Sequence, residues 1–138
     1  MGNNWGIKYH VQSSMNNAED GFHGFHCFLG RFQPLHVGHQ ELFAQQLDKG
    51  RNICIMIRDV EPSEKNPYTA EQVKENIESF YKEFVWTGRV KVMIVPNIVS
   101  INFGRGVGYD IIEHIPPTEI ADISATKIRE QNKTNGII

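Results

Sequence analysis

The sequence predicts an α/β fold in which helices cover both faces of a parallel β-sheet within a single domain. Apolar, strand-like runs alternate with helical patterns in the order strand, helix, strand, helix, strand, which is typical of parallel sheets. One of these runs, residues 52–57, is continuously apolar and bounded by charge, as in a strand buried on both faces. The 138 residues suffice for one core and are too few for two comfortable domains.

The first half of the pattern begins after a polar segment. Residues 1–22 are rich in Asn, Ser and Gly, so we assign them to an N-terminal extension and residues 23–138 to the domain. The first strand is expected at Phe25–Leu29. A helix is expected over Val37–Lys49, with Gly50 as its stop, before the apolar strand at residues 52–57.

The second half opens with a helix whose start has a clear signal. Thr69 and Gln72 have the Thr-x-x-Gln spacing of a capping box. An apolar stripe at helical spacing follows and is expected to face the core: Val73, Ile77, Phe80, Tyr81 and Phe84. Further elements are expected along the rest of the chain: strands at residues 90–95 and 99–103, a helix at 109–115 and a last helix from about Ala125.

Composition restricts the class of protein. The formal net charge of −2 gives no broad attraction to nucleic acid or anionic membranes, so we expect neither as a partner. No apolar run approaches the roughly 20 residues of a membrane span. The polar N-terminus lacks the apolar core of a signal peptide, so we expect a cytoplasmic protein. Cys27 and Cys54 lie in apolar runs and are expected to be reduced core residues.

The first strand is followed by "GRFQPLHVGH", at the edge where parallel sheets bind ligands. Gly38 lets a ligand approach the backbone where a helix begins, and that helix end attracts anions. His36 and His39 can donate hydrogen bonds to phosphoryl oxygens, and Arg31 can add a fixed charge. The combination suits a triphosphate that is attacked at one phosphorus.

Two other readings of the glycines and histidines stay open at this point. Two imidazoles at i and i+3 can ligate zinc, but the site then needs further ligands such as His23, His26 or Cys27. Because a zinc site would require these additional ligands, we predict that the protein itself holds no metal. The stretch "GRGVG" at residues 104–108 reads as a turn or, less well, as a phosphate loop.

A second stretch, "DISATKIRE", carries cations at the start of the last expected helix. Ser124 can cap that helix, whose first turn holds Thr126 and Lys127, with Arg129 just beyond. Cations in a first turn oppose the helix dipole, so they gain most if an anion binds between them.

Together the two stretches resemble the signatures of the nucleotidylyltransferase superfamily. "GRFQPLHVGH" resembles G-x-F-x-P-x-H-x-G-H, and "ISATKIR" resembles I-S-x-T-x-[IV]-R. The sequence Arg-Phe-Gln-Pro and the later "NPYTAEQ" resemble segments of the archaeal-type nicotinamide mononucleotide adenylyltransferases. The resemblance spans roughly Phe25 to Glu130 and implies a Rossmann-like fold.

The resemblance implies transfer of AMP from ATP to a phosphorylated acceptor, with nicotinamide mononucleotide as the best candidate, and release of pyrophosphate. His36, His39 and Arg129 would be catalytic. The other nucleotide-binding positions implied are Gly30, Arg31, Phe32, Gly38, Arg105, Ser124, Thr126 and Lys127. Mg²⁺ would bridge triphosphate oxygens.

The acceptor side carries the weaker expectations. Candidate acceptor-binding residues are Arg58, Asp59, Lys65, Asn66 and Tyr109. The small size is similar to that of glycerol-3-phosphate cytidylyltransferase, so a cytidylyltransferase using CTP and a small phosphorylated alcohol is the alternative. Phosphopantetheine as acceptor and an inactive nucleotide sensor also stay open. We expect copies of the chain to assemble into a homo-oligomer.

Overall fold

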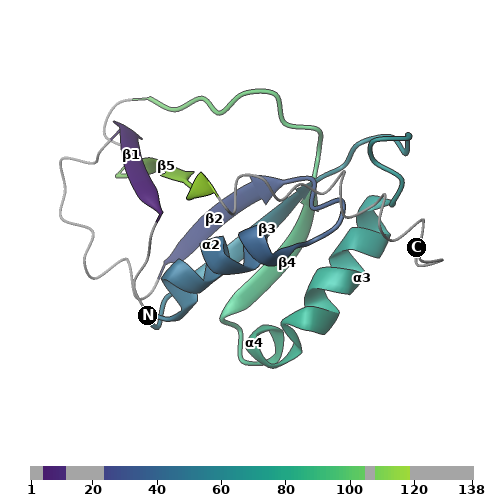
Figure 1. The fold of residues 1–138 in the computed structure, drawn as a ribbon, viewed down its shortest axis with the longest axis horizontal. Coiled ribbons are helices and arrows are strands. Elements are labelled where there is room, and N and C mark those ends of the chain that lie inside the picture. The colour runs from purple at the N-terminus through teal and green to yellow at the C-terminus, as the bar shows by residue number, and fades with distance from the viewer. Residues whose placement is uncertain (1–4, 12–23, 105–107, 119–138) are drawn as a thin grey trace.

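The structure, a computed structural model, describes residues 5–11, 24–104 and 108–118 (Figure 1). Its centre is a parallel three-stranded sheet in the order β2-β3-β4. The strands are β2 (Phe25–Gly30), β3 (Asn52–Arg58) and β4 (Val90–Val95). Each of the three strands begins and ends within one residue of the bounds that its apolar run predicts.

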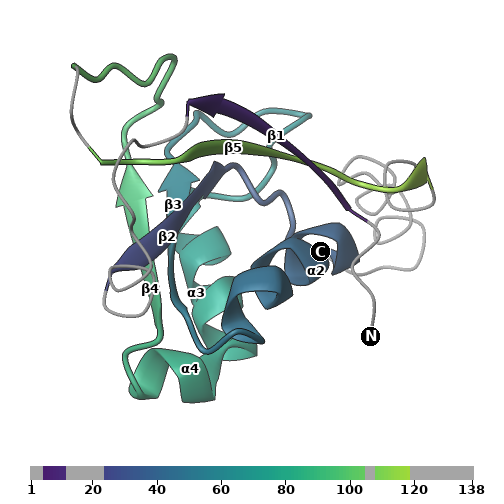
Figure 2. The same cartoon turned by 90° about the vertical axis from the view of Figure 1, so that its left-hand side faces the viewer.

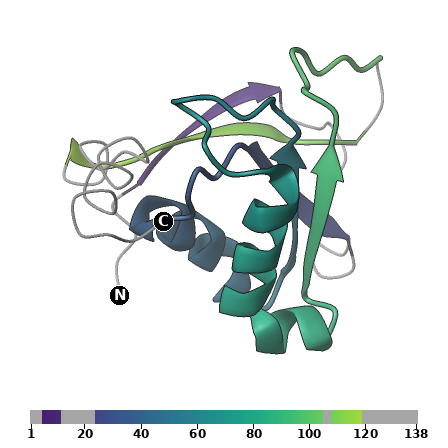
Figure 3. The same ribbon diagram turned by 90° about the vertical axis from the view of Figure 1, so that its right-hand side faces the viewer.

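Helices connect these strands and lie together on one side of the sheet. The chain runs through α2 (Val37–Leu47) between β2 and β3, and through α3 (Ala70–Phe80) and α4 (Lys82–Trp86) between β3 and β4. Both crossovers move across the sheet in the same direction, so right-handed connections place their helices on the same face. Figures 2 and 3 show this arrangement from two sides.

The Rossmann-like α/β fold, with a parallel sheet in one small domain, is confirmed. Within the part of the chain that the structure describes, all three helices lie on one face of the sheet. The opposite face carries none of these three helices.

The core lies between β3 and the helices. Ile53, Ile55 and Ile57 alternate along β3 and are fully buried on the helix side, against Phe43 of α2 and Ile77 of α3. On the opposite face of β3, Cys54 is buried and Met56 is half-buried, so the prediction of a strand buried on both faces holds fully for the helix side and in part for the other. This central strand therefore fixes the positions at which the loops after β2 and β3 begin.

Helix α3 begins where the capping box predicts. The Thr69 backbone N–H donates to Gln72 Oε1 at 2.8 Å, and the Gln72 N–H donates to Thr69 Oγ1 at 3.1 Å. The helical pattern breaks at Tyr81, whose φ is −103° and ψ 29°, so one expected helix becomes α3 and α4. The prediction that Phe80 faces the core is wrong: it is 57% exposed, because Tyr81, about 100° around the helix, takes the core position.

Two expected elements after β4 are wrong. Residues 99–103 form no strand, and their side chains are exposed. Residues 109–115 are not helical: they contain β5 (Ile111–Ile115), which pairs with β1 (Gly6–Val11) in an antiparallel ribbon. The three isoleucines of β5 favour a strand once a partner is present, but that partner lies about a hundred residues earlier in the chain.

The ribbon also changes the interpretation of residues 1–22, where no strand was expected. It is joined across its strands by His10 Nε2 and Glu113 Oε1, 2.9 Å apart, and it touches the main sheet where the His114 and Phe28 rings lie 6.4 Å apart. A two-stranded ribbon alone is marginally stable, so contacts with the rest of the domain such as this one add to its stability. The last expected helix, from about Ala125, lies outside the described residues. No helix in the described ranges combines the length and apolar composition needed to cross a bilayer.

Candidate functional site

The loop after β2 turns sharply because of a glycine and an aromatic residue. Phe32 has a positive φ of 49°, a rare backbone conformation for a residue with a side chain. Its ring folds back onto Gly30, where a Cβ atom would lie 2.9 Å from Phe32 Cζ. Only glycine at position 30 leaves room for this arrangement.

The Phe32 side chain is part of the core and supports the histidine pair. It is 5% exposed and lies against Phe43, with the ring centroids 5.8 Å apart. Its ring also makes a T-shaped contact with the His39 ring, with the ring centroids 4.9 Å apart. Phe32, expected to bind nucleotide, is thus placed where it orients His39 and the loop.

His36 and His39 form the N-terminal cap of α2 and stack on each other. The His36 N–H donates to His39 Nδ1 at 3.1 Å, and the Gly38 N–H donates to His36 Nδ1 at 3.0 Å. The two ring centroids are 3.7 Å apart with 24° between the planes. The spacing i, i+3 therefore has a structural cause, because it is the spacing of a reciprocal capping box.

These hydrogen bonds fix which nitrogen of each ring carries the proton. A backbone N–H can only donate, so each Nδ1 must be an unprotonated acceptor and the neutral ring carries its proton on Nε2. Burial lowers the pKa of His36, and burial together with the neighbouring His36 lowers the pKa of His39 to about 3. Both rings are therefore neutral Nε2–H donors at physiological pH.

The same cap revises what the start of α2 offers an anion. The amides of His36 and Gly38, which the sequence makes candidates for binding phosphate, already donate to imidazoles. Gly38 is also buried. The helix dipole still favours an anion here, and the capping bonds use each Nδ1 and leave each imidazole Nε2–H as a potential donor to it.

Gln33 ties this loop to the one after β3, and sequence reasoning missed it. Its Nε2 donates to the Tyr68 carbonyl at 2.9 Å, and its Oε1 accepts from the Tyr68 N–H at 3.0 Å. Gln33 is only 4% exposed. The signal in the sequence is the joint presence of Arg-Phe-Gln-Pro and Asn-Pro-Tyr-Thr, whose middle residues meet here.

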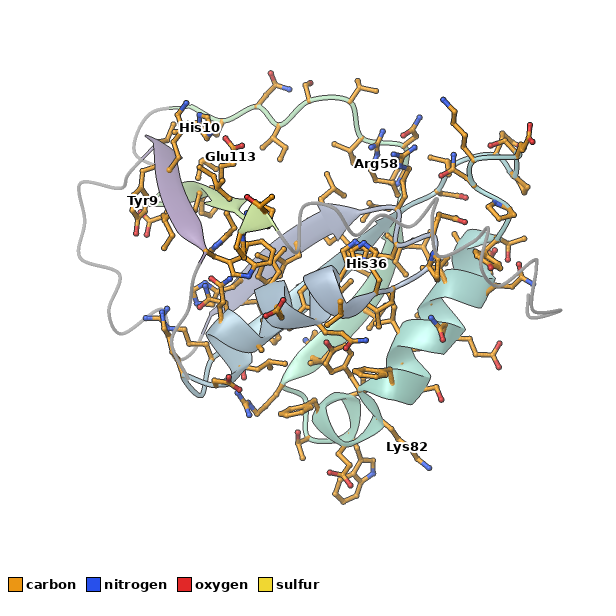
Figure 4. The ribbon with its side chains drawn as sticks, viewed as in Figure 1. Tyr9, His10, His36, Arg58, Lys82 and Glu113 are labelled. Carbon is orange, nitrogen blue, oxygen red and sulfur yellow. The ribbon has the colours of Figure 1, made fainter. Side chains whose placement is uncertain are left out.

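Arg58 lies at the end of β3 and is held by a residue that follows β4. Its Nε and Nη2 both donate to Asn97 Oδ1, at 3.2 and 2.8 Å. Figure 4 shows Arg58 and His36 near the carboxyl ends of the strands of the parallel sheet. Asn97 is a second residue that sequence reasoning did not single out.

The remaining candidates fall into three groups. Arg31, Asp59 and Lys65 are exposed in the loops after β2 and β3, and Asn66 closes a turn by bonding to Ser63. Tyr109 is 62% exposed and lies just before β5, a strand of the ribbon. Two residues of this ribbon, His10 and Glu113, lie well apart from His36 in Figure 4.

The third group lies outside the described residues: Arg105, Ser124, Thr126, Lys127 and Arg129. Among the residues that are described, no three His, Cys, Asp or Glu side chains gather to form a metal site. The zinc reading of His36 and His39 also conflicts with their hydrogen bonds. Each Nδ1 accepts a backbone N–H, so each Nε2 carries the ring proton and neither nitrogen has a lone pair free for a metal.

Comparison with known proteins gives one match. A search of curated proteins and a search of solved structures each found none. Residues 27–90, which run from β2 to the first residue of β4 and include the histidine pair, match the family described as cytidylyltransferase-like. This similarity covers somewhat less than half of the chain and indicates nucleotidyl transfer in general, without distinguishing an adenylyl from a cytidylyl donor.

Proposed function

We propose that the protein is an adenylyltransferase: it transfers AMP from ATP to a phosphorylated acceptor, best nicotinamide mononucleotide, which forms NAD and releases pyrophosphate. The observation that carries the nucleotidyl-transfer part is the neutral, stacked pair of His36 and His39. Two Nε2–H donors at a helix N-terminus suit an anionic group whose charge grows during reaction.

In the proposed reaction an acceptor oxygen attacks the α-phosphorus, and the bond from that phosphorus to the bridging oxygen of the β-phosphate breaks. Pyrophosphate leaves with the electrons of that bond. The imidazoles donate hydrogen bonds to oxygens of the triphosphate without giving up their protons, so catalysis consists of positioning and charge stabilisation. Mg²⁺ would enter with the triphosphate, as part of the substrate.

Different residues at the strand ends would bind the triphosphate and the acceptor. Arg31 and the histidine pair would hold the triphosphate, with Arg129, Ser124, Thr126 and Lys127 as its second set of contacts, inferred from the sequence motif. Arg58 would meet the acceptor phosphate, because Asn97 already directs its guanidinium at the end of β3. Lys65 and Asn66 would approach the acceptor from the loop after β3.

A pyrophosphate-release assay with ATP or CTP and a panel of acceptors tests this function. We expect release with ATP and nicotinamide mononucleotide, accompanied by formation of NAD. Faster release with CTP and a phosphorylated alcohol would establish the cytidylyl alternative instead. Tight binding of ATP without turnover on any acceptor would establish a sensor.

The histidine pair is tested by His39→Asn with His39→Gln as its partner variant. Asn can accept the His36 N–H in place of Nδ1 but lacks the distal donor, whereas Gln can place an amide N–H near the position of Nε2. We expect turnover to fall roughly 10²–10³-fold in His39→Asn, the usual effect of losing one such donor, and less in His39→Gln. Equal turnover in wild type and His39→Asn would contradict the proposed role.

A further inference from the structure

The face of the sheet away from the helices carries a cross-strand pair of thiols. Cys27 of β2 and Cys54 of β3 are register partners in the parallel ladder, so their side chains stand next to each other on the same face. The alternating residues of β3 that fill the core, such as Ile55, point the other way. Cys54 also pairs in register with Lys91 of β4.

The two thiols differ in access to solvent. Cys27 is exposed, whereas Cys54 is 8% exposed. Burial raises the pKa of the Cys54 thiol, and the neighbouring Cys27 raises it further, against an opposite effect of Lys91. The prediction that both cysteines are buried core residues is therefore wrong for Cys27, which points to the face that the helices do not cover and lies on β2, at the edge of the described three-stranded sheet, whereas Cys54 lies on the central strand.

From this arrangement we propose that Cys27 and Cys54 form a modification site, an asymmetric dithiol that a small-molecule disulfide converts reversibly into an intrachain disulfide. Register partners in a sheet have Cα atoms about 4.8 Å apart, within the range of roughly 4.4–6.8 Å that disulfides span. An exposed thiol beside a resolving thiol is the arrangement found in redox-responsive sites.

The chemistry divides between the two residues. The Cys27 thiolate attacks one sulfur of the small-molecule disulfide and expels the other half as a thiolate, which leaves a mixed disulfide on Cys27. Cys54 then loses its proton to solvent, and its sulfur attacks Cys27 Sγ and expels the second half. Two protein thiols lose two electrons in total, and the oxidant is reduced to two small thiols.

The test uses the full chain, oxidised glutathione as the oxidant and intact-mass measurement under non-reducing conditions. Wild type is expected to lose two hydrogens, and dithiothreitol is expected to restore them. Cys54→Ser is expected to stop at one glutathione adduct on Cys27. Cys27→Ser is expected to react at least tenfold more slowly than Cys54→Ser, since Cys54 is buried.

Unfolding both variants in urea provides the control, since each remaining thiol should then react at a similar rate. A folded wild-type protein that stops at a glutathione adduct would overturn the proposal, because Cys54 would then not resolve the intermediate. Equal reactivity of the two folded variants would also overturn it, because the difference in access would be absent. The test is independent of the proposed nucleotidyl transfer.

Discussion

The loops after β2 and β3 begin on neighbouring strands but are built differently. In the first, Phe32 and Gln33 are buried, and the two histidines are bonded to the backbone that carries them. In the second, residues 61–65 are all exposed, and the turn is closed by Ser63 and Asn66. The first loop is therefore fixed by the core, whereas the second depends on contacts at its ends.

The difference corresponds to the two halves of the proposed reaction. Every nucleotidyl transfer presents a triphosphate, so the groups that bind it can be built rigidly into the sheet and α2. The acceptor differs between enzymes, and the loop after β3 that would meet it is exposed. The residues around His36 and His39 therefore indicate the type of reaction, whereas the exposed loop after β3 contains little that identifies the acceptor.

The largest effect on stability is expected from adding one methyl group to the first loop. Gly30→Ala places a Cβ 2.9 Å from Phe32 Cζ, so the Phe32 ring must shift and its contact with the His39 ring is disturbed. We expect a loss of up to about 3 kcal/mol in the free energy of unfolding, as is usual for overpacking. Urea unfolding measures it.

Gly104→Ala is the matched control, because a Cβ at position 104 meets nothing within 4 Å. It should leave the free energy of unfolding within about 0.5 kcal/mol of wild type. The loss caused by Gly30→Ala should be smaller when it is measured in a Phe32→Leu background, where the ring that the new Cβ meets is absent. Equal stability of the Gly30 and Gly104 variants would contradict the account of the first loop.

A smaller effect is expected where the two loops are joined. Gln33→Met keeps the size of the side chain but removes both hydrogen bonds to the Tyr68 backbone. We expect a loss of about 2 kcal/mol, since the Tyr68 amide and carbonyl then lack their partner. Hydrogen exchange should become faster at the Tyr68 amide and stay unchanged within α2. Unchanged exchange at Tyr68 would show that the second loop is held without Gln33.

How much could be predicted from the sequence depends on whether a feature is formed by residues close together or far apart in the chain. Local signals were sufficient for the three parallel strands and for the start of α3 at Thr69. Both the apolar runs of the strands and the capping pair of the helix lie within a few consecutive residues. Pairs distant in the sequence were missed: β1 with β5, Gln33 with Tyr68, and Arg58 with Asn97. The residues around one partner alone do not specify such a pair. For Gln33 and Tyr68 the signal is the presence of Arg-Phe-Gln-Pro and Asn-Pro-Tyr-Thr in the same chain, which becomes a contact only in the fold.

The pH dependence of stability should report on the first loop. In the unfolded chain His36 and His39 bind protons below about pH 6.5, but in the folded protein their pKa values are lowered, to about 3 for His39. Stability should therefore be highest above pH 6.5 and fall as the pH drops toward 3, by less than about 1.4 kcal/mol per pH unit for each histidine.

Denaturant unfolding from pH 7.5 to 4.5 measures this slope. His114, whose pKa is also lowered by burial and by Lys49, adds to it, so His39→Asn and His114→Asn should each reduce the slope. A slope that neither variant changes would show that other groups control the acid response.

The smallest effect is expected at the end of the second loop. Thr69→Ala removes the side-chain oxygen that accepts the Gln72 N–H and should cost about 1 kcal/mol, the usual value for a helix N-cap. Thr69→Ser keeps the oxygen and should remain within a few tenths of a kcal/mol of wild type. Because Thr69 adjoins Tyr68, the double variant with Gln33→Met shows whether the cap and the link between the loops act together. A loss larger than the sum of the two single losses would mean that α3 holds the second loop only while Gln33 does, whereas additive losses would mean that the two ends of this loop are fixed independently.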